Sequence, residues 1–150
     1  AAFAGMLTRV QPGDEVLVYF SGHGSRQPQP EGAPEPEANG FDEIFLPLDI
    51  GHWEGAHGDR QAGVHNALLD DEIGEFLDAL RERNIFVWLV VDTCHSGGAN
   101  RGAGPGGEFR TRAVTEDLLG IPLEARTAAE QRAQARRAPM PRSRWVKAAL

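Results

Sequence analysis

The sequence predicts an α/β fold with a mostly parallel sheet, on the basis of three observations. Two apolar runs, Val16–Phe20 and Ile85–Val91, are short and rich in β-branched residues, which favours strands over helices. Between them, residues 70–84 carry apolar side chains at helical spacing. Each run then passes directly into small residues beside a reactive side chain, as at the carboxyl edge of a parallel sheet, where ligands bind.

The two runs predict the central strands. Glu15–Phe20 follows a break at Pro12–Asp14, and the continuous apolar run Ile85–Val91 indicates a strand buried on both faces. Ala1–Val10 has the spacing of the end of an amphipathic helix. Because two strands do not make a stable open sheet, we expect further strands before Ala1 and after Leu150, so that the domain is only partly contained here.

The helix between the strands has the clearest boundaries in the sequence. We expect Asp70 to cap its first turn, where Asp71 and Glu72 also interact favourably with the helix dipole. Asn84 is a suitable stop, because asparagine tolerates the left-handed conformation that ends many helices.

The other segments give weaker patterns. Ser25–Asn39 is rich in Pro, Glu and Gln and predicts an exposed loop. Phe41–Leu48 predicts an edge hairpin, because Pro47 is excluded from a central strand. Ala113–Leu123 is compatible with a short helix, and Thr127–Ala138 predicts a solvated one.

Composition limits the class of protein. A chain of 150 residues with 41% hydrophobic content predicts one domain with a real core, and no apolar run is long enough to cross a membrane. Cys94 is the only cysteine, so an internal disulfide is excluded. We therefore expect a cytoplasmic protein without membrane partners, since a single thiol fits a reducing compartment.

The net charge of −7 is unevenly distributed. Residues 126–150 hold seven basic side chains and one acidic side chain, whereas residues 1–125 carry a net charge of −13. The acidic body disfavours nucleic acid as a partner, and the basic tail can contact that body instead.

The reactive side chains lie directly after the two predicted strands. Ser21–Gly24 reads Ser-Gly-His-Gly, and Asp92–Gly97 reads Asp-Thr-Cys-His-Ser-Gly. If the strands are parallel neighbours, His23 and Cys94 emerge at the same edge of the sheet. A thiol and an imidazole brought together there form the minimal machinery of a cysteine protease.

These motifs resemble those of the caspase-like cysteine peptidases, in particular the metacaspase branch and its bacterial relatives. Four motifs occur in the family's order between residues 13 and 98: Ser21–Gly24, Gly40–Asp49, Leu69–Glu72 and Asp92–Gly97. The resemblance implies a caspase-like three-layer sandwich, with residues 1–125 as a large-subunit-type catalytic region, incomplete at its N-terminus, and residues 126–150 as a basic linker toward a small-subunit region. The pattern Gln-Ala-Cys-x-Gly of animal caspases is absent, which argues against cleavage after Asp.

The resemblance also implies roles for individual residues. Cys94 would be the nucleophile, His23 the acid and base, and the backbone N–H groups of Gly24 and Cys94 the oxyanion hole. Ser21 and Asp92 would form the wall of the pocket for the residue before the scissile bond. An Asp there selects Arg or Lys through a charge-assisted pair, although Asp92 can alternatively satisfy loop N–H groups.

Asp42, Asp70 and Asp71 resemble the calcium-binding aspartates of calcium-activated metacaspases, and carboxylate oxygens suit that ion. However, Asp70 and Asp71 are already explained by the start of the helix. The family often has an acidic residue soon after the nucleophile, whereas Ser96–Gly107 has none and contains Arg101. We therefore expect no required cofactor, and a calcium dependence is not favoured.

The sequence thus favours an endopeptidase that cleaves proteins or peptides after basic residues. Such an enzyme would have candidate autoprocessing sites in its own tail, at Arg136, Arg137, Arg142 and Arg144. A solvated basic helix explains the same residues equally well. A non-catalytic caspase-like scaffold, or a peptidase of the same fold with another specificity, remains the alternative function.

Overall fold

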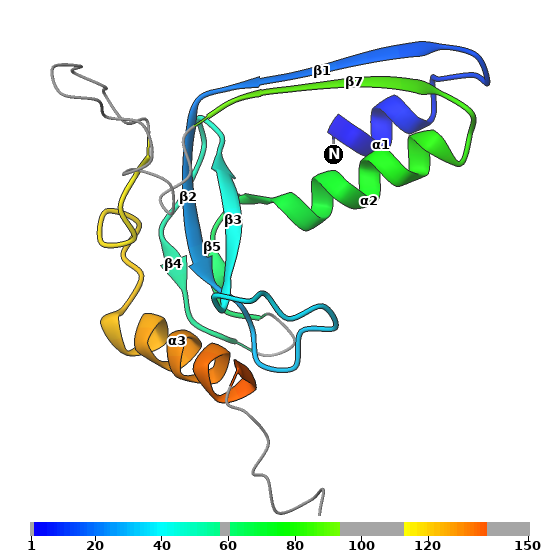
Figure 1. Cartoon of the computed structure of the whole chain (residues 1–150). Coiled ribbons are helices and arrows are strands. Elements are labelled where there is room, and N and C mark those ends of the chain that lie inside the picture. The colour runs from blue at the N-terminus through cyan, green and yellow to red at the C-terminus, as the bar shows by residue number, and fades with distance from the viewer. Residues whose placement is uncertain (1, 58–60, 94–112, 138–150) are drawn as a thin grey trace, which may run out of the picture.

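The predicted parallel strands lie side by side in the computed structural model, which describes residues 2–57, 61–93 and 113–137 (Figure 1). Strand β1 (Glu15–Ser21) pairs in parallel with β7 (Phe86–Asp92), from Glu15 opposite Phe86 to Ser21 opposite Asp92. The α/β class is therefore confirmed, and both strands end at the same edge of the sheet.

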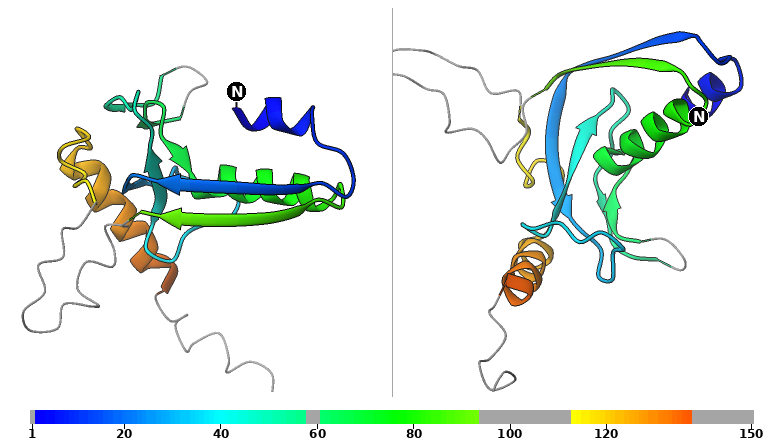
Figure 2. Two further views of the ribbon diagram at one scale, coloured as in Figure 1. Left: turned by 90° about the horizontal axis from the view of Figure 1, so that it is seen from above. Right: turned by 45° about the vertical axis from the view of Figure 1, so that its right-hand side comes forward.

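Two helices cover one face of this strand pair. Helices α1 (Ala2–Leu7) and α2 (Asp70–Arg81) lie beneath β1 and β7 in Figure 1, and the views in Figure 2 agree. The buried contacts between helix and sheet come from Val18, Phe76, Leu80 and Ile85. Phe3 of α1 stacks on Phe76 of α2 with a centroid distance of 4.2 Å, which confirms the apolar face predicted for the first helix.

The opposite face of the strand pair is exposed in the part of the chain that the structure describes. Leu17, Tyr19 and Trp88 are 67%, 59% and 60% exposed. Because side chains alternate along a strand, these residues point away from α1 and α2. The prediction that Ile85–Val91 is buried on both faces is therefore wrong for the described residues, since only one face has a covering layer there.

Helix α2 begins as predicted, but with a different cap. Its N-cap is Leu69, whose backbone N–H donates a hydrogen bond of 3.0 Å to the Glu72 carboxylate, and Asp70 is the first helical residue. The prediction that Asp70 caps the helix is wrong because Leu69 holds the N-cap position and Asp70 already lies within the first turn. Asn84 adopts a left-handed conformation with φ of 58°, as expected for a residue after a helix end.

A small antiparallel sheet continues from the end of β1. Its strands, in the order β2-β3-β6, are β2 (His23–Pro28), β3 (Phe41–Leu46) and β6 (Leu68–Leu69). Two predictions are corrected here. Residues 25–28 form a strand rather than a loop, and residues 41–46 form the central strand rather than an edge hairpin. Pro47 does not prevent this pairing, because it follows the last residue of β3.

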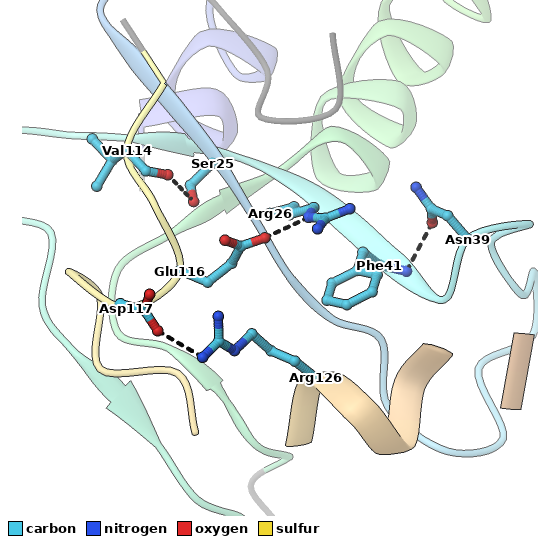
Figure 3. Close-up of polar contacts among 8 residues, drawn as sticks. All are labelled: Ser25, Arg26, Asn39, Phe41, Val114, Glu116, Asp117 and Arg126. Carbon is cyan, nitrogen blue, oxygen red and sulfur yellow. Dashed lines mark hydrogen bonds and ion pairs between the residues drawn. The ribbon is translucent and has the colours of Figure 1, made fainter. Parts of the chain in front are cut away.

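Polar side chains are buried in β2 because they are hydrogen-bonded. The Ser25 hydroxyl donates to the Val114 carbonyl at 2.7 Å (Figure 3). Gln27 accepts a hydrogen bond of 2.8 Å from the Val64 N–H. Val64 belongs to a two-strand hairpin, β4 (Trp53–Glu54) with β5 (Gly63–Val64). Contacts with residues far along the chain therefore stabilise a strand of loop-like composition.

Helix α3 (Leu123–Arg137) closes the described part of the chain and packs beside β2. The residues before it form turns, so the short helix predicted for Ala113–Leu123 is wrong, whereas the helix predicted for Thr127–Ala138 is confirmed. The predicted boundary between residues 125 and 126 falls within α3. Among the residues that the structure describes, no helix has the length and apolar character needed to cross a bilayer.

Candidate active site

The carboxyl ends of β1 and β7 bring two predicted pocket residues together. Ser21 lies opposite Asp92 in the register, and its hydroxyl donates to the Asp92 carboxylate at 3.3 Å. Both residues are exposed, on the sheet face that also carries Leu17 and Tyr19. A carboxylate on an open sheet edge, held by a neighbouring hydroxyl, can pair with a guanidinium or ammonium group.

The strand pair ends directly before the predicted catalytic residues. The Gly22 N–H donates to the Asp92 carbonyl at 3.3 Å, which adds one hydrogen bond beyond Ser21. His23 follows Ser21 by two residues, and Cys94 follows Asp92 by the same number. His23 lies at this edge with an exposed side chain, whereas Cys94 lies outside the described residues.

His23 is also the first residue of β2, where it is opposite Leu46. The next residue, Gly24, is buried, and its carbonyl accepts a hydrogen bond of 2.9 Å from the Val114 N–H. Gly24 also forms a parallel bridge with Ala113, so the segment after the undescribed stretch returns to the side of His23. The proposed oxyanion role of the Gly24 N–H stays a prediction.

A salt bridge fixes this returning segment against β2. Arg26 contacts Glu116 at 2.5 Å and also lies over the Phe41 ring, 4.3 Å from its centroid (Figure 3). Burial opposes ionisation of Glu116, but the hydrogen bond from Arg26 lowers the pKa of this carboxyl below its usual value. The contact thus keeps a negative charge on Glu116 and positions residues 113–116 beside the candidate site.

A cavity of about 210 Å³ is lined in part by His23. Its walls include the apolar side chains Phe20, Phe45 and Leu68, and Thr93 also lines it. Thr93 directly precedes Cys94, so the two segments that carry the predicted dyad border one cavity. The sequence did not indicate this cavity, because its walls come from elements that lie far apart along the chain.

The three predicted calcium ligands do not form a metal site among the described residues. Asp42 on β3 is 3% exposed, and burial together with the nearby Asp71 carboxylate raises its pKa to about 6. A hydrogen bond with Gln29 partly opposes that rise. Within residues 2–57, 61–93 and 113–137, no three His, Cys, Asp or Glu side chains lie close enough to hold a metal ion. The calcium roles of Asp42, Asp70 and Asp71 stay predictions.

The predicted autoprocessing residues are divided between two parts of the chain. Arg136 and Arg137 lie in the last turn of α3, where both are exposed. The Arg136 guanidinium donates to the Glu37 carbonyl at 2.8 Å. Arg142 and Arg144 lie outside the described residues.

The basic tail also contacts the acidic body, as its charge suggested. Arg126 pairs with Asp117 at 2.6 Å (Figure 3), and Arg132 donates to the Gln29 carbonyl at 2.8 Å. These contacts hold α3 against the small antiparallel sheet and against the loop between β2 and β3.

Comparison with known proteins identifies the family. The model of the metacaspase peptidase C14 domain matches residues 1–100, which include all four sequence motifs. The chain belongs to the metacaspase family. It is similar to metacaspase-2 of Arabidopsis thaliana, with 36% identity over 87 residues, or 58% of this chain and 17% of that protein. Metacaspase-1B of Aspergillus clavatus is 32% identical over 89 residues, which are 59% of this chain and 18% of that protein.

A solved structure of a Geobacter sulfurreducens protein aligns with 93% of this metacaspase-family chain and 44% of the other chain, at 19% identity and a TM-score of 0.49. The regions shared with the curated metacaspases make up less than a fifth of those proteins. The family is thus established, whereas the activity of the whole protein is a separate question.

Proposed function

We propose that this chain supplies the dyad-bearing part of a cysteine endopeptidase that cleaves proteins or peptides after Arg or Lys. The observation that carries the proposal is the hydrogen-bonded pair of Ser21 and Asp92. It lies at the register-matched ends of two parallel strands, two residues before His23 and two before Cys94. Family membership supports the same reaction class.

In the proposed reaction, Cys94 attacks the carbonyl carbon of the scissile bond while its proton passes to His23. The tetrahedral intermediate carries its negative charge on the former carbonyl oxygen, to which the N–H groups of Gly24 and Cys94 donate. Its collapse breaks the C–N bond, and His23 gives its proton to the leaving amine. Water then attacks the acyl-enzyme with His23 as base, which releases the acid and restores the thiol.

The preference for basic residues is assigned to Asp92. Its carboxylate would pair with the guanidinium or ammonium of the substrate residue before the scissile bond, and Ser21 would orient that carboxylate. Arg can form two parallel hydrogen bonds with a carboxylate, so we expect Arg to be preferred over Lys. No cofactor enters this scheme.

Autoprocessing in the tail is part of the proposal, as is a cytoplasmic location. The candidate bonds follow Arg136, Arg137, Arg142 and Arg144. Proteases bind extended chains, so cleavage at Arg136 or Arg137 requires the last turn of α3 to unwind. At Arg136 it also requires loss of the hydrogen bond to Glu37. We therefore expect cleavage after Arg136 or Arg137 to be slow while α3 is folded.

Hydrolysis of fluorogenic peptides that end in Arg or in Asp before an aminocoumarin group tests the proposal. We expect turnover of the Arg peptide alone, and its loss by at least about 1000-fold in Cys94→Ala. Asp92→Asn should lower kcat/KM for Arg by about a hundredfold, because a charged partner loses its counter-charge. Asp78→Asn is the matched control, since Asp78 forms only an exposed ion pair within α2, and it should leave kcat/KM unchanged.

The outcomes separate the candidate functions. If Asp92→Asn still hydrolyses the Arg peptide at the wild-type rate, residues other than Asp92 determine the preference for Arg. No turnover from a folded protein would favour the non-catalytic scaffold. Intact mass after incubation shows whether the tail is cut, and cutting that continues in Cys94→Ala would exclude autoprocessing.

A further inference from the structure

We propose that the cavity beside His23 is a subsite for an apolar side chain of the substrate, that of the residue directly after the scissile bond. The inference rests on the proposed peptidase activity and adds a second determinant of specificity to it. A Leu- or Phe-sized side chain is the expected occupant.

The cavity and the Ser21–Asp92 pair lie on opposite sides of the end of β1. Ser21 belongs to the open sheet face, whereas the preceding Phe20 points toward the helices and packs against Phe45, at a centroid distance of 5.5 Å. Phe45 and Leu68, which line the cavity, belong to the same helix-side cluster as Phe20. Ser21 and Gly22 also line the cavity, so it adjoins the polar pair.

An extended peptide matches this two-sided arrangement. Its successive side chains point in opposite directions, so a basic residue directed at Asp92 places the side chains of its neighbours on the other side. Only one neighbour contributes the leaving amine, the residue after the scissile bond, and His23 protonates that nitrogen in the proposed reaction. Because His23 itself lines the cavity, this residue is the one nearest to it.

The size of the cavity fits a large apolar side chain. A cavity of about 150 Å³ lined by apolar residues is enough to bind benzene. The volume of about 210 Å³ found here therefore admits a Leu or Phe side chain.

Two features of the cavity point to a ligand. Leu48, which lines it, is fully exposed at 106%, so an apolar ligand would remove this surface from water. The hydroxyl oxygen of Thr93 is buried without a hydrogen-bond partner among the residues that the structure describes. A buried hydroxyl without a partner is costly, and a bound peptide offers backbone N–H and C=O groups to satisfy it.

Internally quenched peptides that differ in one residue test the subsite. Each contains a single Arg, followed by either Leu or Gly, and kcat/KM is measured on the same enzyme preparation. We expect the wild-type protein to prefer the Leu peptide by about tenfold, as full burial of a Leu side chain predicts. The preference is a ratio of two rates, so a change in the fraction of active enzyme cancels.

Leu48→Asp places a carboxylate at the rim of the cavity and should reduce this preference to about threefold or less. Because Leu48 is fully exposed, the variant is expected to fold. Leu118→Asp makes the same change at an exposed leucine that does not line the cavity, and should keep the tenfold preference.

The Arg–aminocoumarin peptide serves as the second readout. Its turnover by the wild-type protein tests the peptidase activity separately from the comparison of the Leu and Gly peptides. Turnover of this peptide without a Leu preference, or with a preference that Leu48→Asp does not reduce, would overturn the subsite alone. No turnover of the coumarin peptide by the wild-type protein would overturn the peptidase itself, and the subsite with it.

Discussion

The parallel strand pair and the small antiparallel sheet are stabilised by different kinds of contact. Around β1 and β7, burial is apolar, and Val18, Leu80 and Ile85 pack together under one face. In the β2-β3-β6 sheet, polar groups are buried as well, and Ser25 and Gln27 depend on hydrogen bonds to distant backbone groups. The first region follows from local sequence patterns, whereas the second depends on partners that only the folded chain supplies.

The largest expected effect lies in the apolar region. Leu80 has no exposed surface, so Leu80→Ala should lower the free energy of unfolding by roughly 2–5 kcal/mol, through lost burial and the cavity left behind. Denaturant unfolding measures the change. Leu118→Ala, at a leucine that is 69% exposed, is the control and should cost no more than about 0.5 kcal/mol. Equal effects of the two changes would contradict the packing of α2 against β1 and β7.

The difference between the two regions explains which predictions succeeded. The strand predictions for Val16–Phe20 and Ile85–Val91 are confirmed, because a continuous apolar run favours a strand without reference to distant residues. Residues 25–28 predict a loop because Ser25-Arg26-Gln27-Pro28 has no such run, yet they form a strand. Their burial depends on Val114 and Val64, which are 89 and 37 residues away, and no local pattern contains that information.

The candidate site also has one part that local sequence patterns predict and one part that they do not. The juxtaposition of Ser21 and Asp92 followed from two strands and one assumption, that they are parallel neighbours, and the register confirms it. The cavity beside His23 could not be predicted, because Phe20, Phe45 and Leu68 come from three separate elements.

The second prediction concerns Asp42 in the polar region. This carboxyl ionises near its ordinary pKa of 3.8 in the unfolded chain, whereas burial raises its pKa to about 6 in the folded protein. Between these values the folded state keeps a proton that the unfolded state has lost, so stability falls as the pH rises through about 6. Asp42→Asn removes this cost and should raise the free energy of unfolding at about pH 8 by on the order of 2 kcal/mol.

The pH dependence shows whether the stabilisation by Asp42→Asn comes from removing the buried charge or from an effect of the substitution that is independent of pH. At about pH 4, Asp42 is protonated in the folded protein, and we expect Asn to change stability little there. Glu75→Gln, at an exposed carboxylate of α2, is the control and should have no comparable effect at either pH. A loss of stability for Asp42→Asn at the higher pH would instead indicate that a cation holds the ionised carboxylate, and would revive the calcium hypothesis.

The smallest expected effect tests how α3 is attached to the polar region. Gly40 has φ of +85°, and a Cβ atom there would lie 2.5 Å from the Ala129 carbonyl oxygen of α3. Gly32 has a similar φ of +80°, but nothing lies within 4 Å of its Cβ position. Both glycine-to-alanine changes strain the backbone. Only Gly40→Ala also forces the helix away, which should cost about 1 kcal/mol more in denaturant unfolding.

The pair of variants therefore isolates the close approach of α3 from backbone strain. If Gly40→Ala and Gly32→Ala cost the same, α3 moves without penalty, and its arginines do not fix the loop between β2 and β3. If Gly40→Ala costs more, the contacts of Arg132 with Gln29 and of Arg136 with Glu37 belong to a packed interface. The same interface would then slow cleavage at Arg136 and Arg137, so Gly40→Ala should speed the cleavage of α3 in the autoprocessing assay.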